Sequence, residues 1–276
     1  MNDKLKDIQA LECGMLCECK RLCEKYDIPY FLAQGTLIGA AREKGFIPWD
    51  DDVDILMPFE ELDRFVEVFR TEGDARYFIT NTSVEEKYPF TWTKVRMNGT
   101  TSMPTLYQRL PIHWGICMDI FPIYPVSNLR PLRAAEIFFF KVARKLLLAE
   151  MTECEPDASL VNRLIEKIPR RLRKSLADKG IGLLRRHDNR TAYVYVTCKG
   201  GGVVKREILF GEKKELPFEG DLYRVPADYH KYLTQFFGDY MTPPPPEARK
   251  GHESRMGDII WDCENGFEVY QKKAVR

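Results

Sequence analysis

Four aspartates fall within five consecutive residues of this chain, at positions 50, 51, 52 and 54, and they run directly into the apolar residues Ile55, Leu56 and Met57. Two unit charges ~4 Å apart repel by roughly 1 kcal/mol in water and by several times more near a protein interior. A bound cation would offset this repulsion. Carboxylate oxygens suit Mg²⁺, which takes one or two carboxylates together with substrate phosphates, and they also suit Mn²⁺. The cluster therefore predicts a site for Mg²⁺ or Mn²⁺.

The alternation of the cluster indicates which carboxylates act together. Side chains of a β-strand alternate between two faces, so a strand here would place Asp52 and Asp54 on the same face. Asp50 has the same parity and would lie at the entrance of the strand. Asp51 has the opposite parity and is expected to be solvated or to lie behind the ligands. The predicted metal ligands in this segment are therefore Asp50, Asp52 and Asp54.

The residues that precede the cluster favour nucleotidyl chemistry. A short apolar run, residues 30–32, meets Gly35, where a backbone without a Cβ can approach a ligand closely. Thr36 is a suitable N-cap for a helix over residues 37–43, and Gly45 is a suitable stop. Because a helix N-terminus binds phosphate readily, we expect Gly35 and Thr36 to contact substrate. The order strand, Gly-Thr, helix, loop and Asp-x-Asp strand is that of polymerase-β-like nucleotidyltransferases.

Three other interpretations of the aspartates are open. A glycosyltransferase that uses a nucleotide sugar would keep the Asp-x-Asp but would not need the Gly-Thr pair and its helix. A solvated acidic patch is disfavoured by the apolar flanks. An EF-hand loop would place Asp50, Asp52, Asp54 and Glu61 at positions one, three, five and twelve, but its sixth position must be Gly and is Ile55 here.

The stretch "GTLIGAAREKGFIPWDDDVDI" (residues 35–55) resembles the signature of LicD-type phosphotransferases, the bacterial relatives of the fukutin group. Later segments resemble further family blocks in the expected order: "TKVRMNGTTS" (93–102), "MDIFPIYPV" (118–126) and "FFGDYMTPPPPEARKGHES" (236–254). The resemblance implies a nucleotidyltransferase-like fold. It also implies transfer of phosphocholine, or of another phospho-alcohol such as glycerol or ribitol phosphate, from a CDP-activated donor to a glycan hydroxyl.

The resemblance also assigns roles to residues. It implies that Asp50, Asp52, Asp54 and Asp119 are the metal-site carboxylates, with Asp52, Asp54 and Asp119 catalytic. Asp119 lies in a strand-like run and would either complete the metal site or accept the proton of the acceptor hydroxyl. A turn cap ahead of Pro122 is the alternative for this residue.

Other residues are expected to bind substrate. Lys94 and Arg96 share one strand face, which could meet the donor diphosphate or be an exposed face. The prolines 243–246 favour an extended segment, which would carry cations across the mouth of the site or form a surface tail. The expected substrate-binding residues are Gly35, Thr36, Arg42, Trp49, Lys94, Arg96, Arg249 and His252. The candidates for an aromatic cage around choline are Trp49, Trp92, Tyr107 and Trp114.

Composition narrows the class of protein. The 276 residues carry a net charge of +1, which does not suggest bulk nucleic-acid binding. Residues 163–190 are rich in Lys and Arg with apolar residues interleaved, as in a solvated helix face or a surface for anionic lipid or a polyanionic acceptor. No signal peptide or membrane span is visible. We therefore expect a cytoplasmic protein with peripheral contact at the inner membrane face, where lipid-linked glycans are made.

The expected fold is α+β. One domain, residues 1–276, would contain a mixed sheet flanked by helices, with a helical insertion over residues 129–190. Within the insertion we expect helices over residues 132–152 and 160–186. The eight cysteines are expected to be reduced thiols, because their spacing matches no common zinc or iron–sulfur pattern. A non-catalytic glycan-binding relative is the remaining alternative, and the complete carboxylate set disfavours it.

Overall fold

A mixed seven-stranded sheet forms the centre of the computed structural model, which describes residues 3–152, 154, 159–188, 190–198, 201–249, 251 and 258–271. The strands run in the order β1-β2-β6-β4-β3, and β7 and β8 extend the sheet from the second half of β6. The strands of this sheet are β1 (Phe31–Leu32), β2 (Asp54–Pro58), β3 (Tyr77–Thr80), β4 (Thr93–Met97), β6 (Cys117–Val126), β7 (Tyr193–Val196) and β8 (Val203–Lys205).

The ten-residue strand β6 organises the sheet. It pairs in parallel with β2 along one edge, and in antiparallel fashion with β4 and then β7 along the other. Its even-numbered residues Met118 and Ile120 are fully buried in the main core. Because β6 is the partner of both β2 and β4, the side chains of three strands meet at its N-terminal end.

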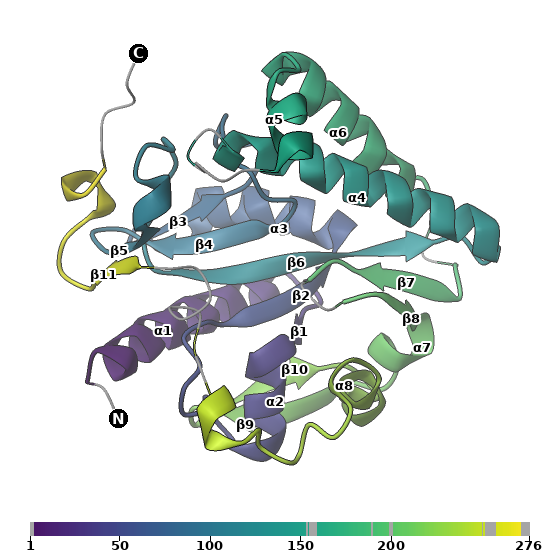
Figure 1. Cartoon of the computed structure of the whole chain (residues 1–276). Coiled ribbons are helices and arrows are strands. Elements are labelled where there is room, and N and C mark those ends of the chain that lie inside the picture. The colour runs from purple at the N-terminus through teal and green to yellow at the C-terminus, as the bar shows by residue number, and fades with distance from the viewer. Residues whose placement is uncertain are drawn as a thin grey trace.

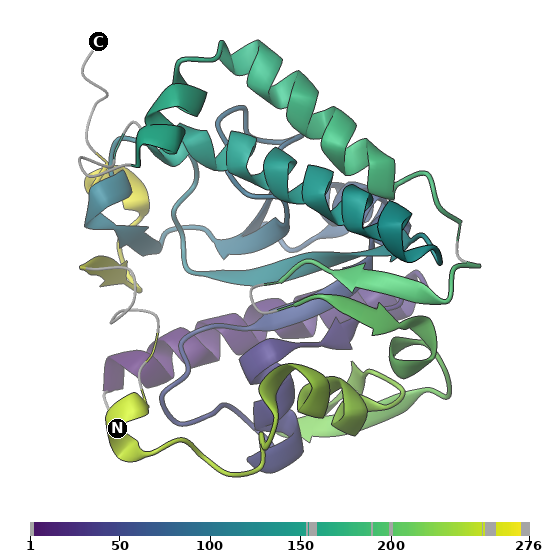
Figure 2. The ribbon, with the colours of Figure 1, turned by 45° about the vertical axis from the view of Figure 1, so that its right-hand side comes forward.

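Helices cover the sheet on both sides (Figures 1 and 2). The helix α1 contacts β6 and β4, and α3 contacts β2, β3 and β6. In both views α4, α5 and α6 lie on the other side of β6 from α1 and form a separate layer. The α-helices are α1 (Asp3–Lys25), α2 (Gln34–Arg42), α3 (Phe59–Glu72), α4 (Arg130–Thr152), α5 (Leu160–Glu166), α6 (Arg170–Leu184), α7 (Arg206–Leu209) and α8 (Tyr229–Phe237).

Two small antiparallel ladders complete the described structure. One joins β9 (Lys214–Phe218) to β10 (Asp221–Val225), and the other joins β5 (Thr101–Pro104) to β11 (Ile259–Asp262). Three short 3₁₀ segments are η1 (Thr105–Tyr107), η2 (Pro246–Ala248) and η4 (Phe267–Val269). The α+β class with a mixed sheet and flanking helices is confirmed. The eight cysteines are free thiols, and Cys19 and Cys23 are buried.

Several element boundaries differ from those expected. The helix expected over residues 160–186 is two helices, because Pro169 cannot supply the backbone N–H that a continuous helix needs. The helix expected to begin after Thr36 begins at Gln34, with Ala33 as its N-cap. The extended segment expected over prolines 243–246 ends one residue earlier, since Pro246 opens a 3₁₀ turn.

Burial keeps the His113 imidazole neutral. Its ring stacks on Phe78 with centroids 4.9 Å apart, and its Nδ1 accepts the Gly115 N–H at 3.0 Å. Burial, and secondarily the charge of Arg96, lower the pKa of His113 from 6.5 to about 3. The unfolded chain therefore binds a proton that the folded chain excludes once the pH falls below about 6.5.

We expect this difference to lower the free energy of unfolding by about 1.4 kcal/mol for each pH unit between the unfolded and folded pKa values. The contribution is complete above the unfolded pKa and is lost as the pH falls toward the folded pKa. Urea unfolding at pH values across this window measures the slope. His113→Gln should show a shallower acid dependence than the natural protein, and equal slopes would contradict a neutral buried imidazole.

Candidate active site

Asp54 and Asp119 lie side by side on the two parallel strands. They are register partners of β2 and β6, and the pairing continues through the next four residue pairs. Partners in a parallel ladder project to the same face of the sheet. The Asp119 N–H donates to the Val53 carbonyl at 2.8 Å and fixes the start of this ladder. The structure thus brings together two carboxylates that lie 65 positions apart in the sequence.

Asp54 is a buried carboxylate whose Oδ1 has no hydrogen-bond partner among the described residues. Burial is the largest cause of a pKa raised well above that of an ordinary Asp, and the neighbouring Asp52, Asp119 and Asp50 raise it further. The positive charge of Lys94 acts in the opposite direction. A buried carboxylate with one unpartnered oxygen among like charges is an arrangement that a cation would relieve.

Asp50, Asp51 and Asp52 form a compact group ahead of β2. One carboxylate oxygen from each lies within 4.8 Å of the other two, which is a spacing that a metal ion can bridge. The donors are all carboxylate oxygens, as Mg²⁺ or Mn²⁺ prefers. With the unpartnered Oδ1 of Asp54 nearby, the residues present fit a hard divalent cation.

The placement of Asp51 corrects the argument from alternation. The strand β2 begins at Asp54, so residues 50–53 lie in a loop and strand parity does not govern them. Asp51 is buried, with only 7% of its surface exposed, and it belongs to the carboxylate group rather than facing solvent. A loop can turn successive carboxylates toward one point, which a strand cannot do.

Gly35 and Thr36 support this loop from α2. The Thr36 hydroxyl accepts the Asp54 N–H at 2.9 Å, so it anchors the first residue of β2 rather than capping the helix. A Cβ on Gly35 would lie 2.2 Å from Oδ2 of Asp50. The absence of a side chain at Gly35 therefore makes room for the Asp50 carboxylate.

We expect Gly35→Ala to displace the Asp50 carboxylate and to lower turnover by about 10–100-fold, since small misplacements at a reacting centre reach this size. The fold should survive, because Ala is favoured over Gly within a helix by about 1 kcal/mol. Steady-state kinetics and urea unfolding measure the two effects. The matched control is Gly182→Ala in α6, where a Cβ meets nothing within 4 Å. Full activity in Gly35→Ala would contradict a functional position for Asp50.

Lys94 is the cation nearest to the strand carboxylates. It is the register partner of Asp119 and forms a half-buried ion pair with it. Its Nζ also lies 5.6 Å from the ring centroid of Phe90 and 5.9 Å from that of Trp92. Burial disfavours the charged amine, but Asp119 outweighs this effect, and the pKa of Lys94 is raised. Asp119 therefore has a local cation partner.

Arg96 lies apart from the carboxylates. Its side chain is almost fully buried, donates to the Gly115 carbonyl at 2.9 Å, and lies over the Trp114 ring at 5.5 Å. The Trp114 indole N–H donates to the Leu110 carbonyl, and its ring stacks with Tyr107. Of the expected cage aromatics, Trp114 and Tyr107 thus belong to this separate apolar cluster.

Trp92 and Trp49 each have a cationic neighbour. Trp92 packs on Phe121, which follows Asp119 by two residues on β6, and Arg144 of α4 lies 5.4 Å from its ring centroid. The guanidinium of Arg249 lies 5.1 Å from the ring centroid of Trp49. Both rings therefore have a face that already accommodates a positive charge.

The segment that includes Tyr240 and Gly251 approaches the carboxylate group 50–52. A Cβ on Gly251 would lie 2.8 Å from Oδ2 of Asp51, so the backbone passes directly over the loop. Arg42 donates to the Tyr240 carbonyl at 2.9 Å and pairs with Glu43, which ties α2 to the start of this segment. His252 lies outside the described residues.

Two residues of α1 that were not among the expected site residues also reach the site. Gln9 donates to the Asp50 carbonyl at 2.8 Å. Glu12, one turn later, is buried, and burial followed by the charge of Asp52 raises its pKa well above that of an ordinary Glu. The feature of the sequence that could have indicated them is a pair of polar residues, spaced by three, on the helix face that also carries the apolar residues Ile8 and Met15.

Comparison with known proteins identifies the relatives of the chain. Residues 27–138 match the family model described as "LicD/FKTN/FKRP, nucleotidyltransferase domain". The chain is 30% identical over 274 residues to the lipopolysaccharide cholinephosphotransferase LicD of Haemophilus influenzae, and the match covers 93% of this chain and 98% of the relative. An uncharacterised protein of Rickettsia typhi is 37% identical over 54 residues, which is 20% of this chain and 18% of the relative. An uncharacterised protein of Rickettsia prowazekii is 40% identical over 47 residues, which is 17% of this chain and 18% of the relative.

Proposed function

The chain belongs to the LicD family, and we propose that it transfers phosphocholine, or a related phospho-alcohol, from a CDP-activated donor to a hydroxyl of a cell-surface glycan or its precursor. The match over nearly the full length of the Haemophilus cholinephosphotransferase supports the phosphotransferase class and, within it, choline and lipopolysaccharide. The observation that carries the proposal is the adjacency of Asp54 and Asp119 on parallel strands, beside the compact carboxylate group 50–52.

We also propose that the fold is nucleotidyltransferase-like. The matched family model, residues 27–138, spans β1, α2, β2, α3, β3, β4, β5, β6 and the first turns of α4, which includes every strand that carries a site carboxylate. Folds of this kind position carboxylates on adjacent strands and a Gly-containing turn before a helix. In this chain Asp54 and Asp119 lie on the adjacent strands β2 and β6, and Gly35 lies in the first turn of α2 beside Asp50, which supports the proposal.

Asp50, Asp51, Asp52 and Asp54 are the residues that would hold a divalent cation. When bound, Mg²⁺ or Mn²⁺ would neutralise charge on the donor diphosphate and on the oxygens of the transferred group. Phosphoryl transfer depends chiefly on positioning and electrostatic stabilisation, so the protein must fix these carboxylates before the substrates arrive. Thr36, Gln9 and the open space at Gly35 perform that task here.

Asp119 and Lys94 would act on the reacting oxygens. In the proposed reaction the acceptor hydroxyl attacks the phosphorus that carries the alcohol, its proton leaves to a base, and CMP departs with the electron pair of the broken P–O bond. Asp119 would either accept that proton or complete the metal site. Lys94 fixes the orientation of the Asp119 carboxylate through their ion pair.

A donor panel tests the proposal. The protein is incubated with CDP-choline, CDP-glycerol, CDP-ribitol and a set of sugar nucleotides, each with a lipopolysaccharide acceptor, and nucleotide release is followed by mass spectrometry. Release of CMP from a CDP-alcohol supports the proposal. Release of a nucleoside diphosphate from a sugar nucleotide would instead assign the Asp-x-Asp to a glycosyltransferase, and no release from any donor would favour a glycan-binding role.

A further inference from the structure

Exposed apolar side chains concentrate on the three helices between β6 and β7. Among the residues that the structure describes, fifteen large hydrophobic side chains are exposed, and ten of them lie between positions 129 and 190. That segment is less than a quarter of the chain. Scattered exposed hydrophobic residues are ordinary, but a concentration on one layer marks an interaction surface. The ten are Leu129, Leu132, Phe138, Phe139, Val142, Leu160, Val161, Leu164, Leu172 and Leu176.

The helix α4 is apolar on both its inner and its outer faces. Phe140 and Leu147 are buried on the inner face, while Phe138 and Val142 are exposed on the outer face. Phe138 is 61% exposed, and its ring contacts that of Phe139. A helix on a protein surface normally turns a polar face to water, so an apolar outer face indicates that something covers it. Figures 1 and 2 show α4 and α6 side by side at the periphery, with no described segment outside them.

The same layer is strongly basic. Residues 129–190 contain fifteen Lys and Arg against eight Asp and Glu, a net charge of +7, whereas the whole chain carries +1 and the remainder therefore carries −6. Lys141 and Lys145 follow Phe138 and Val142 along the exposed face of α4. Neither lysine has an ion-pair or hydrogen-bond partner among the described residues, so both present uncompensated charge to the surroundings.

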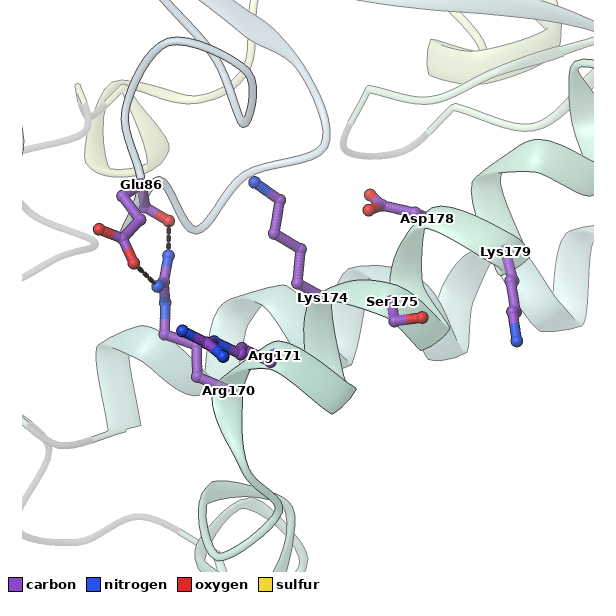
Figure 3. Close-up of a pocket in the computed structure, with 7 residues that line it drawn as sticks. All are labelled: Glu86, Arg170, Arg171, Lys174, Ser175, Asp178 and Lys179. Atoms are coloured by element: carbon purple, nitrogen blue, oxygen red, sulfur yellow. Dashed lines mark hydrogen bonds and ion pairs between the residues drawn. The ribbon is translucent and has the colours of Figure 1, made fainter.

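The helix α6 adds cations beside its own apolar residues. Leu172 and Leu176 are exposed, and the neighbouring Arg171 and Lys179 line a groove of about 580 Å³ (Figure 3). In that groove Arg170 forms an ion pair with Glu86, and Lys174 donates to the Thr82 carbonyl at 3.1 Å. Gly180 packs against the Phe139 carbonyl and Ala143, so α6 and α4 are held in close contact.

We infer that the layer α4–α6 is a docking surface for an anionic membrane, with the exposed apolar residues in the headgroup region and the cations against lipid phosphates. Interfacial helices combine aromatic and aliphatic residues with Lys and Arg in this way. No helix among the described residues is long and apolar enough to cross a bilayer. A second copy of the chain is a poorer occupant, because a two-fold interface would place two net-basic layers against each other.

Co-sedimentation with vesicles tests the inference on the full-length protein. We expect binding to mixed phosphatidylcholine–phosphatidylglycerol vesicles and weak or no binding to pure phosphatidylcholine. Each cation near an anionic surface contributes about a fivefold change in affinity, so Lys141→Glu with Lys145→Glu should weaken binding by at least ~30-fold. Phe138→Ser with Val142→Ser should also weaken it, by removing the apolar insertion. The assay uses neither donor nor acceptor, so its result does not depend on the proposed reaction.

Matched variants on other elements control for charge and hydrophobicity. Lys205→Glu with Lys213→Glu makes the same change in net charge at exposed sites outside the layer. Leu222→Ser with Val269→Ser removes exposed apolar groups from β10 and η4. Both control pairs should bind vesicles as the natural protein does. Equal binding to the two kinds of vesicle, or equal losses in the control variants, would overturn the inference. So would a dimer in solution that Phe138→Ser dissociates.

Discussion

Asp54→Asn should abolish transfer while leaving the free energy of unfolding unchanged or slightly raised. The Asp54 carboxylate is buried without a hydrogen-bond partner for Oδ1, and its pKa is raised by burial and by its acidic neighbours. A group whose folded pKa lies above its unfolded pKa lowers stability as the pH rises from the unfolded pKa toward the folded pKa, and the amide removes that penalty. The same substitution removes a ligand of the proposed cation, because a neutral amide does not carry the negative charge of the carboxylate.

Two measurements on one preparation check this expectation. Transfer assays should show loss of turnover, and urea unfolding of the metal-free protein should show equal or greater stability. Asp63→Asn is the matched control, because Asp63 is an exposed carboxylate whose ion pair with Arg185 lies on the protein surface. That control should retain activity. An active Asp54→Asn enzyme would exclude Asp54 from the metal site, and a large loss of stability would show that its charge is structurally required.

Asp119→Asn should also lower turnover, by at least ~10²-fold, which is the usual effect of removing a positioned proton acceptor. Its effect on stability should have the opposite sign to that at Asp54. Removing the Asp119 charge leaves Lys94 as a half-buried cation without its partner, and breaking such a pair costs about 3 kcal/mol when burial is deep. Asp54 and Asp119 both lie in apolar strands, but we expect the charge of Asp54 to destabilise the fold and the charge of Asp119 to stabilise it.

A second variant separates the two roles that Asp119 could have. Asp119→Asn combined with Lys94→Met removes both charges, so much of the lost stability should return while turnover stays low. If Asp119 is a metal ligand, the affinity for Mn²⁺ should fall in Asp119→Asn. If Asp119 is the proton acceptor, that affinity should be unchanged while turnover stays low. Full turnover in either variant would exclude Asp119 from the reaction.

The sequence predicted the parts of the site that depend on local pattern. Apolar runs flank both Asp54 and Asp119, and each run is a strand of the sheet. That the two strands are neighbours follows from the family resemblance and not from the local pattern. Lys94 was expected to face the donor, and the structure places it in the same neighbourhood, paired with Asp119. Whether these residues bind metal or substrate stays a prediction.

The predictions that were wrong depend on where a helix or strand begins, or on contacts between segments distant in the sequence. The alternation of side chains along a strand does not apply to Asp51, because the strand starts only at Asp54 and the residues before it form a loop. Arg96 shares the parity of Lys94, yet it is buried against Trp114, a contact that needs the tertiary arrangement of the following loop. Glu12 could not be connected to the aspartates, because nothing in a helix sequence reveals which strand it will cover.

The most direct test of the account is the mass of the acceptor after incubation with CDP-choline. With Mg²⁺, the natural protein should add phosphocholine to lipopolysaccharide and release CMP in equal amount. Chelation by EDTA should stop both, and restored Mg²⁺ should restart them, while Asp54→Asn should give neither at any metal concentration. Equal product formation in excess chelator, or in Asp54→Asn, would contradict a metal-dependent transfer at the β2–β6 carboxylates.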